Sequence, residues 1–215
     1  MNTEILEKYS AIIGSDEAGK GEWLGPLVIA AVATTPEQSS YLVSQGVMDS
    51  KELKVETIMR LADIIKKKSL SHYVVTITPQ RFNKFLQEVK EEGKSLNDIL
   101  AWGHAKAISQ VYEELKEKGL QGKFKVFIDE FDQLKTEKRL KRVLELSMLD
   151  VEQKPKAEEE TAVAAASILA RAARELWIDE ESKRLNLNLR GISAKEALAC
   201  NNVDYFAKTS FLQHK

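Results

Sequence analysis

The chain has 215 residues, of which 43% are hydrophobic and 30% are charged. This length fits one domain with a sizeable core, and we find no repeat, low-complexity tract or linker that would divide it. The net charge of −1 means that a nucleic acid would have to be met by a local basic patch. The single cysteine, Cys200, excludes an intrachain disulfide and argues against a thiolate metal site. We find no signal-peptide pattern and no membrane-spanning apolar run, from which we expect a cytoplasmic protein.

A polar stretch near the N-terminus lies between two apolar, β-prone runs, at 11–14 and 27–33, which predict strands. It holds two adjacent carboxylates, a lysine and three glycines that allow positive φ and close backbone approach to a ligand: Asp16, Glu17, Gly19, Lys20, Gly21 and Gly25. Carboxylates bind hard cations, and backbone N–H groups with a lysine bind phosphate or hydroxyl, so the stretch suits metal-assisted phosphoester chemistry. A charged surface hairpin explains it about equally well, because it matches neither a Walker A loop nor a GxGxxG pattern.

The rest of the chain alternates helices and strands. We expect a polar link at 34–40, a strand at 72–78 and strands at 125–129 and 148–153. Capping residues and apolar spacing predict helices over about 52–68 (capped by Asp49 or Ser50), 79–93, 96–118, 136–146 and 161–183, and a last helix capped by Ser193. This pattern predicts an α/β fold whose mixed sheet is partly antiparallel, partly parallel and flanked by helices.

Several residues have both an ordinary and a functional interpretation. His104 lies on a predicted helix, where a lone histidine is more often structural than catalytic, and no second histidine lies at ligand spacing. The basic helix at 136–146 fits a solvated face as well as a nucleic-acid contact. The tail at 203–211 could bind a phosphate backbone or could be an ordinary docked C-terminus.

Acidic residues occur at three separated points: Asp16–Glu17, Asp129 and the run 158–160. Strand ends of an open sheet can converge on one edge, where ligands commonly bind. Converging carboxylates repel one another unless a cation is present, and oxygen ligands without cysteine or paired histidine favour Mg²⁺ or Mn²⁺. Two such ions would activate water and stabilise the leaving oxygen of a phosphodiester. The spacing alone does not show that the acids meet.

Four motifs taken together resemble the type 2 ribonucleases H, over nearly the whole chain. They are Ser15-Asp16-Glu17-Ala18-Gly19-Lys20-Gly21 with Gly25-Pro26, Asp49-Ser50-Lys51, Phe127-Ile128-Asp129, and Lys156-Ala157-Glu158 followed by 164–171. The resemblance implies an RNase H-like fold with a helical C-terminal segment over about 172–215. It also implies a ribonuclease H that cuts the RNA strand of RNA–DNA hybrids with two Mg²⁺ or Mn²⁺ ions, leaving 5′-phosphate and 3′-hydroxyl ends. The implied partner is the hybrid duplex; no membrane contact and no obligate protein partner are evident.

Within this family the chain looks closer to ribonuclease HIII than to ribonuclease HII. Lys20 stands where HII typically has arginine, Glu158 stands where HII usually has aspartate, and the segments 96–104 and 206–209 look HIII-like. Ribonuclease HIII usually has an additional N-terminal substrate-binding domain, whereas this chain begins about fifteen residues before Asp16. We therefore expect a single catalytic domain over 1–215 without that N-terminal domain.

The resemblance also implies roles for individual residues. Asp16 would bridge the two ions, Glu17 and Asp129 would complete their shells, and Glu158, or else Glu159, would be the fourth acidic ligand. The loop residues Gly19, Lys20 and Gly21 would sense a ribose 2′-hydroxyl, which distinguishes RNA from DNA. Phosphates would be held, without reading the base sequence, by Ser50, Lys51, Lys208 and Thr209.

Three other functions compete with this interpretation. One is a different two-metal nuclease or phosphatase on the same fold, acting on DNA or on a small phosphate ester. The second is ribonuclease HII-type cleavage at single ribonucleotides in DNA. The third is a non-catalytic module that binds hybrids. A purely structural protein would not explain why Gly19-Lys20-Gly21 stands beside two acids.

Overall fold

The framework of the protein is a five-stranded sheet in the order β3-β2-β1-β4-β5. The computed structural model describes residues 8–47, 53–129, 149–154, 157 and 160–212. The strands are β1 (Ala11–Ala18), β2 (Leu27–Thr34), β3 (Ser71–Ile77), β4 (Phe124–Asp129) and β5 (Leu149–Lys154). Strands β1, β2 and β3 are antiparallel neighbours, whereas β4 and β5 join in parallel, which confirms the predicted mixed sheet.

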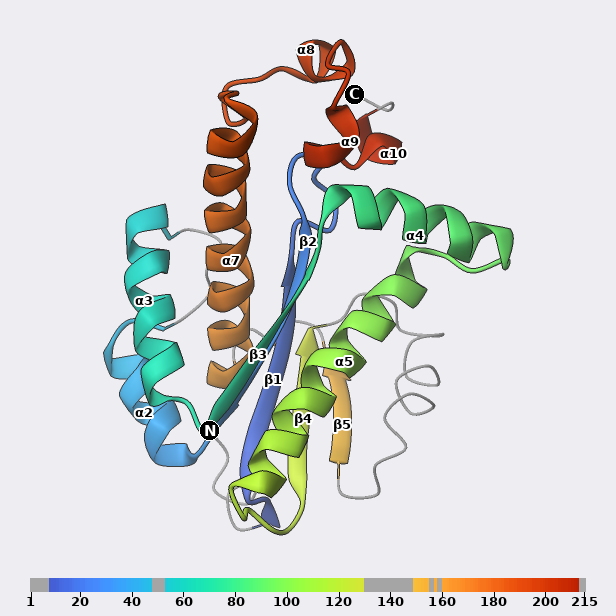
Figure 1. Ribbon diagram of the computed structural model, residues 1–215. Helices are drawn as coiled ribbons and strands as arrows, with labels where there is room; N and C mark the ends of the chain where they lie inside the picture. Colours follow the sequence, from blue (N-terminus) through green and yellow to red (C-terminus); the bar gives the residue numbers. More distant parts are fainter. Residues whose placement is uncertain (1–7, 48–52, 130–148, 155–156, 158–159, 213–215) are drawn as a thin grey trace.

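Helices cover both faces of this sheet (Figure 1). On one face α5 (Leu96–Glu117) lies across β1, β2 and β3, and α4 (Pro79–Glu91) packs beside it. On the other face α7 (Thr161–Leu185) lies against β1 and β2, with α2 (Pro36–Ser44) and α3 (Val55–Lys68) next to it. All eight residues of β2 are buried, because its side chains alternate between the two layers. Leu27 and Ile29 face α5, while Val28 and Ala30 face α7.

The helix α7 approaches β1 more closely than side chains would normally allow. A Cβ atom on Gly14 would lie 2.1 Å from the carbonyl carbon of Ala162, so only glycine fits this position. The first turns of α7 are mostly alanine, which permits the same close approach from the helix side. As a result, the beginning of α7 is held directly beside the middle of β1.

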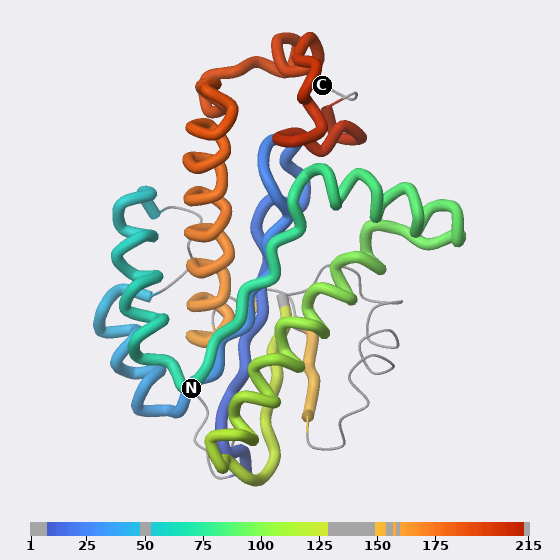
Figure 2. The backbone as a smooth tube through the Cα atoms, viewed as in Figure 1, coloured from blue at the N-terminus to red at the C-terminus, as the bar shows by residue number. Residues whose placement is uncertain are grey.

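The C-terminal segment forms a small helical unit at one end of the molecule. It contains α8 (Ala194–Leu198), α9 (Val203–Phe206) and α10 (Thr209–Leu212), and its apolar core includes Ile178, Leu189 and Phe206. Figure 2 shows this red segment next to the connection between β1 and β2 and beside α4. Backbone hydrogen bonds from Gly25 N–H to the Phe206 carbonyl (2.9 Å) and from Lys208 N–H to the Trp23 carbonyl (2.7 Å) join the segment to that connection.

Two expectations about local structure were wrong. The expected polar link at 34–40 is largely the helix α2, which begins at Pro36 and is capped by Thr35. Thr35 and Gln38 form a reciprocal capping box. Polar residues at these positions are compatible with a helix cap as well as with a loop. The first strand also extends to Ala18 instead of ending at residue 14, because its hydrogen bonding to β2 continues past the last apolar residue.

The other expected helices and strands that fall on described residues are present within a few residues of their expected bounds. The helix capped by Ser193, however, is not the last one, because α9 and α10 follow it. The basic helix at 136–146 and the caps Asp49 and Ser50 lie outside the described residues. None of the helices in the described part of the chain has the length and hydrophobicity needed to cross a bilayer.

Candidate active site

Asp16 and Glu17 lie near the C-terminal end of β1, just before the glycine-containing loop 19–25. Successive side chains of a strand point to opposite faces, so Gly14 and Asp16 share the α7 face, and Ser15 and Glu17 share the α5 face. Both acids are partly buried. The backbone N–H of Glu17 donates a 2.8 Å hydrogen bond to Asp16 Oδ1, which helps to fix the Asp16 carboxylate.

The backbone of β4 brings Asp129 beside Asp16. Strands β1 and β4 are parallel, and Ser15 pairs with Ile128, so the next residues along both strands are Asp16 and Asp129. Neighbouring strands lie about 4.8 Å apart, and side chains at paired positions share a face. The sheet register thus places two of the predicted acids, 113 residues apart in sequence, at neighbouring positions on one sheet edge.

The other predicted ligands and phosphate contacts are only partly described. Glu158, Glu159, Ser50 and Lys51 lie outside the described residues, as does the side chain of Asp129. Ala157 is fully buried and packs with Ile12, Phe127, Ala162 and Val163. Among the side chains that the structure describes, no group of three acids, histidines or cysteines is gathered closely enough to hold a metal ion.

The Glu17 carboxylate has two cationic or polar neighbours. His104 Nε2 lies 3.2 Å from Glu17 Oε2, and Lys20 Nζ lies 3.4 Å from Glu17 Oε1. Burial alone would raise the pKa of Glu17, but the hydrogen bond and attraction from His104, with Lys20 beside it, outweigh burial and lower the pKa below its usual value. Glu17 is therefore an anion at neutral pH and is suited to face a cation.

The sequence leaves His104 open between a structural and a catalytic residue and does not predict its contact with Glu17. The α5 helix passes close to β2 at Gly103, where a Cβ atom would lie 2.6 Å from Ile29 Cδ1, and the next residue projects its ring into the interior. The His104 side chain is fully buried. The position of His104 beside a glycine in the apolar stripe of α5 could have indicated that the histidine is buried. Its partner could not be predicted, because that depends on how α5 packs on the sheet.

In the loop that follows the acids, two of the three glycines have the positive φ that was expected. Gly19 has φ of +84° and Gly25 has φ of +78°, whereas Gly21 has no positive φ. Gly21 is exposed, and a Cβ atom there would meet nothing within 4 Å, so its backbone is open to an incoming ligand. Lys20 is partly exposed beside it.

Side chains of α7 and of the C-terminal segment contact the loop 19–25 and stabilise it. Arg174 of α7 pairs with Glu22 and donates a 3.0 Å hydrogen bond to the Leu24 carbonyl. The Lys208 side chain is fully buried and donates to the Gly25 carbonyl. Burial, reinforced by the nearby Arg174, lowers the pKa of Lys208 to about 7.

Thr209, the other predicted phosphate contact in the tail, is partly buried at the start of α10. Its backbone N–H donates a 3.0 Å hydrogen bond to Asn83 Oδ1 of α4. Direct phosphate contacts from Lys208 and Thr209 stay predictions. In the structure both residues join the C-terminal segment to its neighbours.

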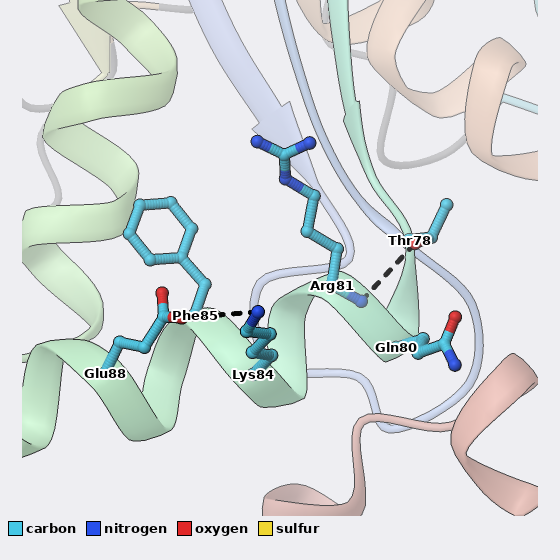
Figure 3. Close-up of a pocket in the computed structure, with 6 residues that line it drawn as sticks. All are labelled: Thr78, Gln80, Arg81, Lys84, Phe85 and Glu88. Atoms are coloured by element: carbon cyan, nitrogen blue, oxygen red, sulfur yellow. Dashed lines mark hydrogen bonds and ion pairs between the residues drawn. The ribbon is translucent and has the colours of Figure 1, made fainter.

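A separate hollow of about 500 Å³ lies on the surface of α4 (Figure 3). It is lined by Thr78, Gln80, Arg81, Lys84, Phe85 and Glu88. Arg81 and Phe85 point to the same side of the helix in Figure 3, and Lys84 pairs with Glu88 at 3.8 Å. The hollow carries a small positive excess and does not include the acids of β1.

The described acids fit a hard divalent cation. Asp16 and Glu17 offer carboxylate oxygen donors, the backbone register places Asp129 next to Asp16, and none of these residues supplies sulfur. A cation would offset the repulsion between acids at neighbouring positions of the sheet edge.

Comparison with known proteins shows the family and the fold of this chain. The family model described as Ribonuclease HII matches residues 13–196. The chain is 41% identical over 202 residues to ribonuclease HIII of Protochlamydia amoebophila, covering 88% of this chain and 62% of that protein. The chain thus spans less than two thirds of the length of this relative.

Solved structures share the fold. The crystal structure of Bst-RNase HIII in complex with Mn²⁺ superposes with a TM-score of 0.77 at 26% identity, covering 95% of this chain and 69% of that one. RNase HII in the PCNA:RNase HII complex from Archaeoglobus fulgidus gives a TM-score of 0.63 at 29% identity, covering 81% of this chain and 78% of that one. The expected RNase H-like fold is therefore confirmed. The chain belongs to the ribonuclease HII family, the type 2 ribonucleases H, and within it resembles ribonuclease HIII more closely than ribonuclease HII.

Proposed function

We propose that this chain carries the catalytic site of a ribonuclease H that hydrolyses the RNA strand of RNA–DNA hybrids. The observation that carries this function is the register of β1 and β4, which sets Asp16 and Asp129 at neighbouring positions beside Glu17 and the glycine loop. Membership of the ribonuclease HII family supports the reaction class. The chain spans 62% of the Protochlamydia relative, so its activity without the remaining length is part of what we propose.

The acids would hold two divalent ions, Mg²⁺ or Mn²⁺. Asp16 would contact both ions, with Glu17 and Asp129 completing the ligand set and Glu158 as the fourth acid. Such ions, when bound, lower the pKa of water and stabilise the charge on a phosphodiester oxygen. The Mn²⁺ complex of Bst-RNase HIII, a relative of the same fold, supports this class of ion. Cleavage would leave 5′-phosphate and 3′-hydroxyl ends.

The loop 19–25 would recognise the RNA strand. Gly21 is exposed and the Lys20 side chain is partly exposed, so both would be open to a ribose next to the scissile phosphate. Backbone N–H and C=O groups can bond to a 2′-hydroxyl, which DNA lacks. The bracing of this loop by Arg174 and Lys208 would keep its backbone in place when the substrate binds.

A panel of end-labelled duplexes tests this function. It would contain a continuous RNA–DNA hybrid, the matching DNA duplex, the matching RNA duplex and DNA with one ribonucleotide, each incubated with Mg²⁺ and then with Mn²⁺. We expect cleavage of the RNA strand of the hybrid, leaving 5′-phosphate and 3′-hydroxyl ends, and little cleavage elsewhere.

The alternatives predict different results in the same panel. Efficient cleavage on the 5′ side of the single ribonucleotide would indicate ribonuclease HII-type specificity. Cleavage of the DNA duplex would indicate another nuclease on this fold. Binding of the hybrid without cleavage in either ion would contradict the proposed function and favour a non-catalytic hybrid-binding module.

A further inference from the structure

Three side chains form a hydrogen-bonded row from the interior of the protein to the candidate site. Ser15 and Glu17 come from the same face of β1, and His104 comes from α5, which packs on that face. Ser15 Oγ lies 2.8 Å from His104 Nδ1, and His104 Nε2 lies 3.2 Å from Glu17 Oε2. Both nitrogens of a fully buried imidazole are therefore engaged, one of them by a proposed metal ligand.

The chemistry of the partners determines the direction of this row at the Glu17 end. A carboxylate can only accept, so the hydrogen between His104 and Glu17 belongs to Nε2. Ser15 Oγ also lies 2.8 Å from the carbonyl oxygen of Ala30 in β2, which anchors the hydroxyl to the sheet. The ring is thus fixed in orientation from the sheet side, and its Nε2–H is directed at one oxygen of Glu17.

Such a contact restricts the Glu17 carboxylate more than packing alone would. The Glu17 side chain is 11% exposed and has Lys20 3.4 Å from its other oxygen, Oε1. His104 of α5 thus holds Oε2, while Lys20 of the loop lies beside Oε1. Without that donor the carboxylate could rotate and turn both oxygens towards the Lys20 ammonium.

We propose that His104 is a positioning residue that holds Glu17 in the orientation in which its other oxygen, Oε1, binds the divalent cation beside Lys20. This role rests on the proposed function, because it takes Glu17 as a metal ligand. Hydrogen-bond partners of metal ligands commonly contribute about 10- to 100-fold to metal affinity. His104 itself would contact neither the ion nor the substrate.

Two substitutions at one position separate the hydrogen bond from the packing of the ring. In His104→Gln the side-chain amide N–H₂ can take the place of Nε2 and still donate to Glu17. In His104→Asn the shorter amide reaches only the position of Nδ1, near Ser15. Both variants lose the ring, so a role in packing alone would affect both of them.

The measurement is calorimetric titration of the metal-free proteins with Mn²⁺ in the absence of nucleic acid. We expect His104→Asn to bind Mn²⁺ about 10- to 100-fold more weakly than the wild type, and His104→Gln to bind it within about threefold. In a cleavage assay, His104→Asn should need more Mn²⁺ for half-maximal rate and should be rescued by excess Mn²⁺. Its KM for the hybrid at saturating Mn²⁺ should be unchanged.

Several results would overturn the role of His104. One is that Mn²⁺ binding weakens equally in the Asn and Gln variants. Another is that a folded Asn variant binds Mn²⁺ within about twofold of the wild type. A third is that the wild type does not bind Mn²⁺. If the Asn variant does not fold, Ser15→Ala, which removes the anchor of the ring, should weaken Mn²⁺ binding by about threefold or more. An unchanged affinity of Ser15→Ala would then contradict the proposal.

Failure of the positioning role and failure of the proposed function give different results. If the wild type binds Mn²⁺ and the Asn variant does not, but no duplex is cut, the role of His104 holds and the ribonuclease function falls. If the hybrid is cut but Mn²⁺ affinity is independent of residue 104, the function holds and the positioning role falls.

Discussion

At the scale of single residues, glycines decide where backbones meet. The prediction that glycines near the acids would allow unusual backbone geometry is confirmed for Gly19 and Gly25 by their positive φ values. Gly14, which the motif of acids did not single out, has a tighter constraint, because the backbone of α7 lies where its side chain would be. Gly21 has neither constraint, so its identity is open to a functional explanation.

Substitution of two of these glycines should have effects of very different size on stability. Gly14→Ala would place Cβ 2.1 Å from the carbonyl carbon of Ala162, and neither backbone can move without separating α7 from β1. We expect the free energy of unfolding to fall by at least about 3 kcal/mol. Gly21→Ala should change it by less than about 0.5 kcal/mol. Urea denaturation measures both, and equal stabilities would show that α7 does not approach β1 this closely.

Lys208 should make stability depend on pH in the mildly alkaline range. Its pKa is about 7 in the folded protein, against an ordinary value of 10.5. Between these values the unfolded chain binds one more proton than the folded chain, so the free energy of unfolding should rise with pH. The rise from this residue is about 1.4 kcal/mol per pH unit. Below about pH 7 both states are protonated, and this contribution no longer changes.

The test of this prediction compares slopes and not absolute stabilities. Urea denaturation of the wild type and of Lys208→Met between pH 7.5 and pH 9 should show a steeper rise for the wild type. Loss of the hydrogen bond to Gly25 would by itself lower the stability of the Met variant equally at every pH, so it would not account for a difference in slope. Parallel curves would mean that Lys208 keeps its ordinary pKa in the folded protein.

At the scale of elements, local signals in the sequence predicted most helices. The side chain of Thr78 accepts from Arg81 N–H at the start of α4, and Ser95 forms a capping box with Asp98 at the start of α5. The same kind of signal at Thr35 and Gln38 precedes α2, which the sequence reasoning missed because the polar residues after Thr35 also suit a loop. Short helices with one apolar face residue give little periodicity, and their caps are then the better evidence.

The attachment of the C-terminal segment to α4 should depend on one side chain. Asn83 donates to the Ala207 carbonyl at 3.0 Å and accepts from Thr209 N–H at 3.0 Å. Asn83→Ala leaves both backbone groups without this partner, so we expect a loss of about 1 to 3 kcal/mol in unfolding free energy. Gln87→Ala, which removes an exposed contact to Glu91 on the same helix, is the control and should change little. Equal effects of the two substitutions would contradict the bridging role of Asn83.

At the scale of the whole molecule, the sequence predicted the sheet but not which side chains would meet on it. Apolar, β-prone runs identified β2 and β4, and acids at strand ends suggested one edge as the site. That Asp16 and Asp129 are neighbours depends on the register of β1 against β4, which is formed by residues distant in sequence. The contact of His104 with Ser15 spans 89 residues and depends on how α5 crosses the sheet. Neither of these two contacts can be predicted from local sequence patterns.

The balanced charge of the molecule predicts that hybrid binding depends on a few local cations. Affinity measured by fluorescence anisotropy in metal-free buffer should fall as salt rises, because each contact with a phosphate releases counterions. Lys20→Ala should reduce the slope of log K against log [salt] by about 1 if Lys20 contacts the backbone. Lys116→Ala, which removes an exposed lysine paired with Glu113 on α5, should leave the slope unchanged. An unchanged slope in Lys20→Ala would remove Lys20 from the binding surface.

The most direct test of the central claim is cleavage of an end-labelled RNA–DNA hybrid by the wild type and by Asp16→Asn. If Asp16 holds the divalent ions as proposed, its loss removes several kcal/mol of transition-state stabilisation, so we expect the variant to cut at least about 100-fold more slowly. Its thermal unfolding should match or exceed that of the wild type, because one of two neighbouring acids has been neutralised. Equal cleavage by the two proteins, or loss of folding in Asp16→Asn, would contradict a metal-dependent site at the paired ends of β1 and β4.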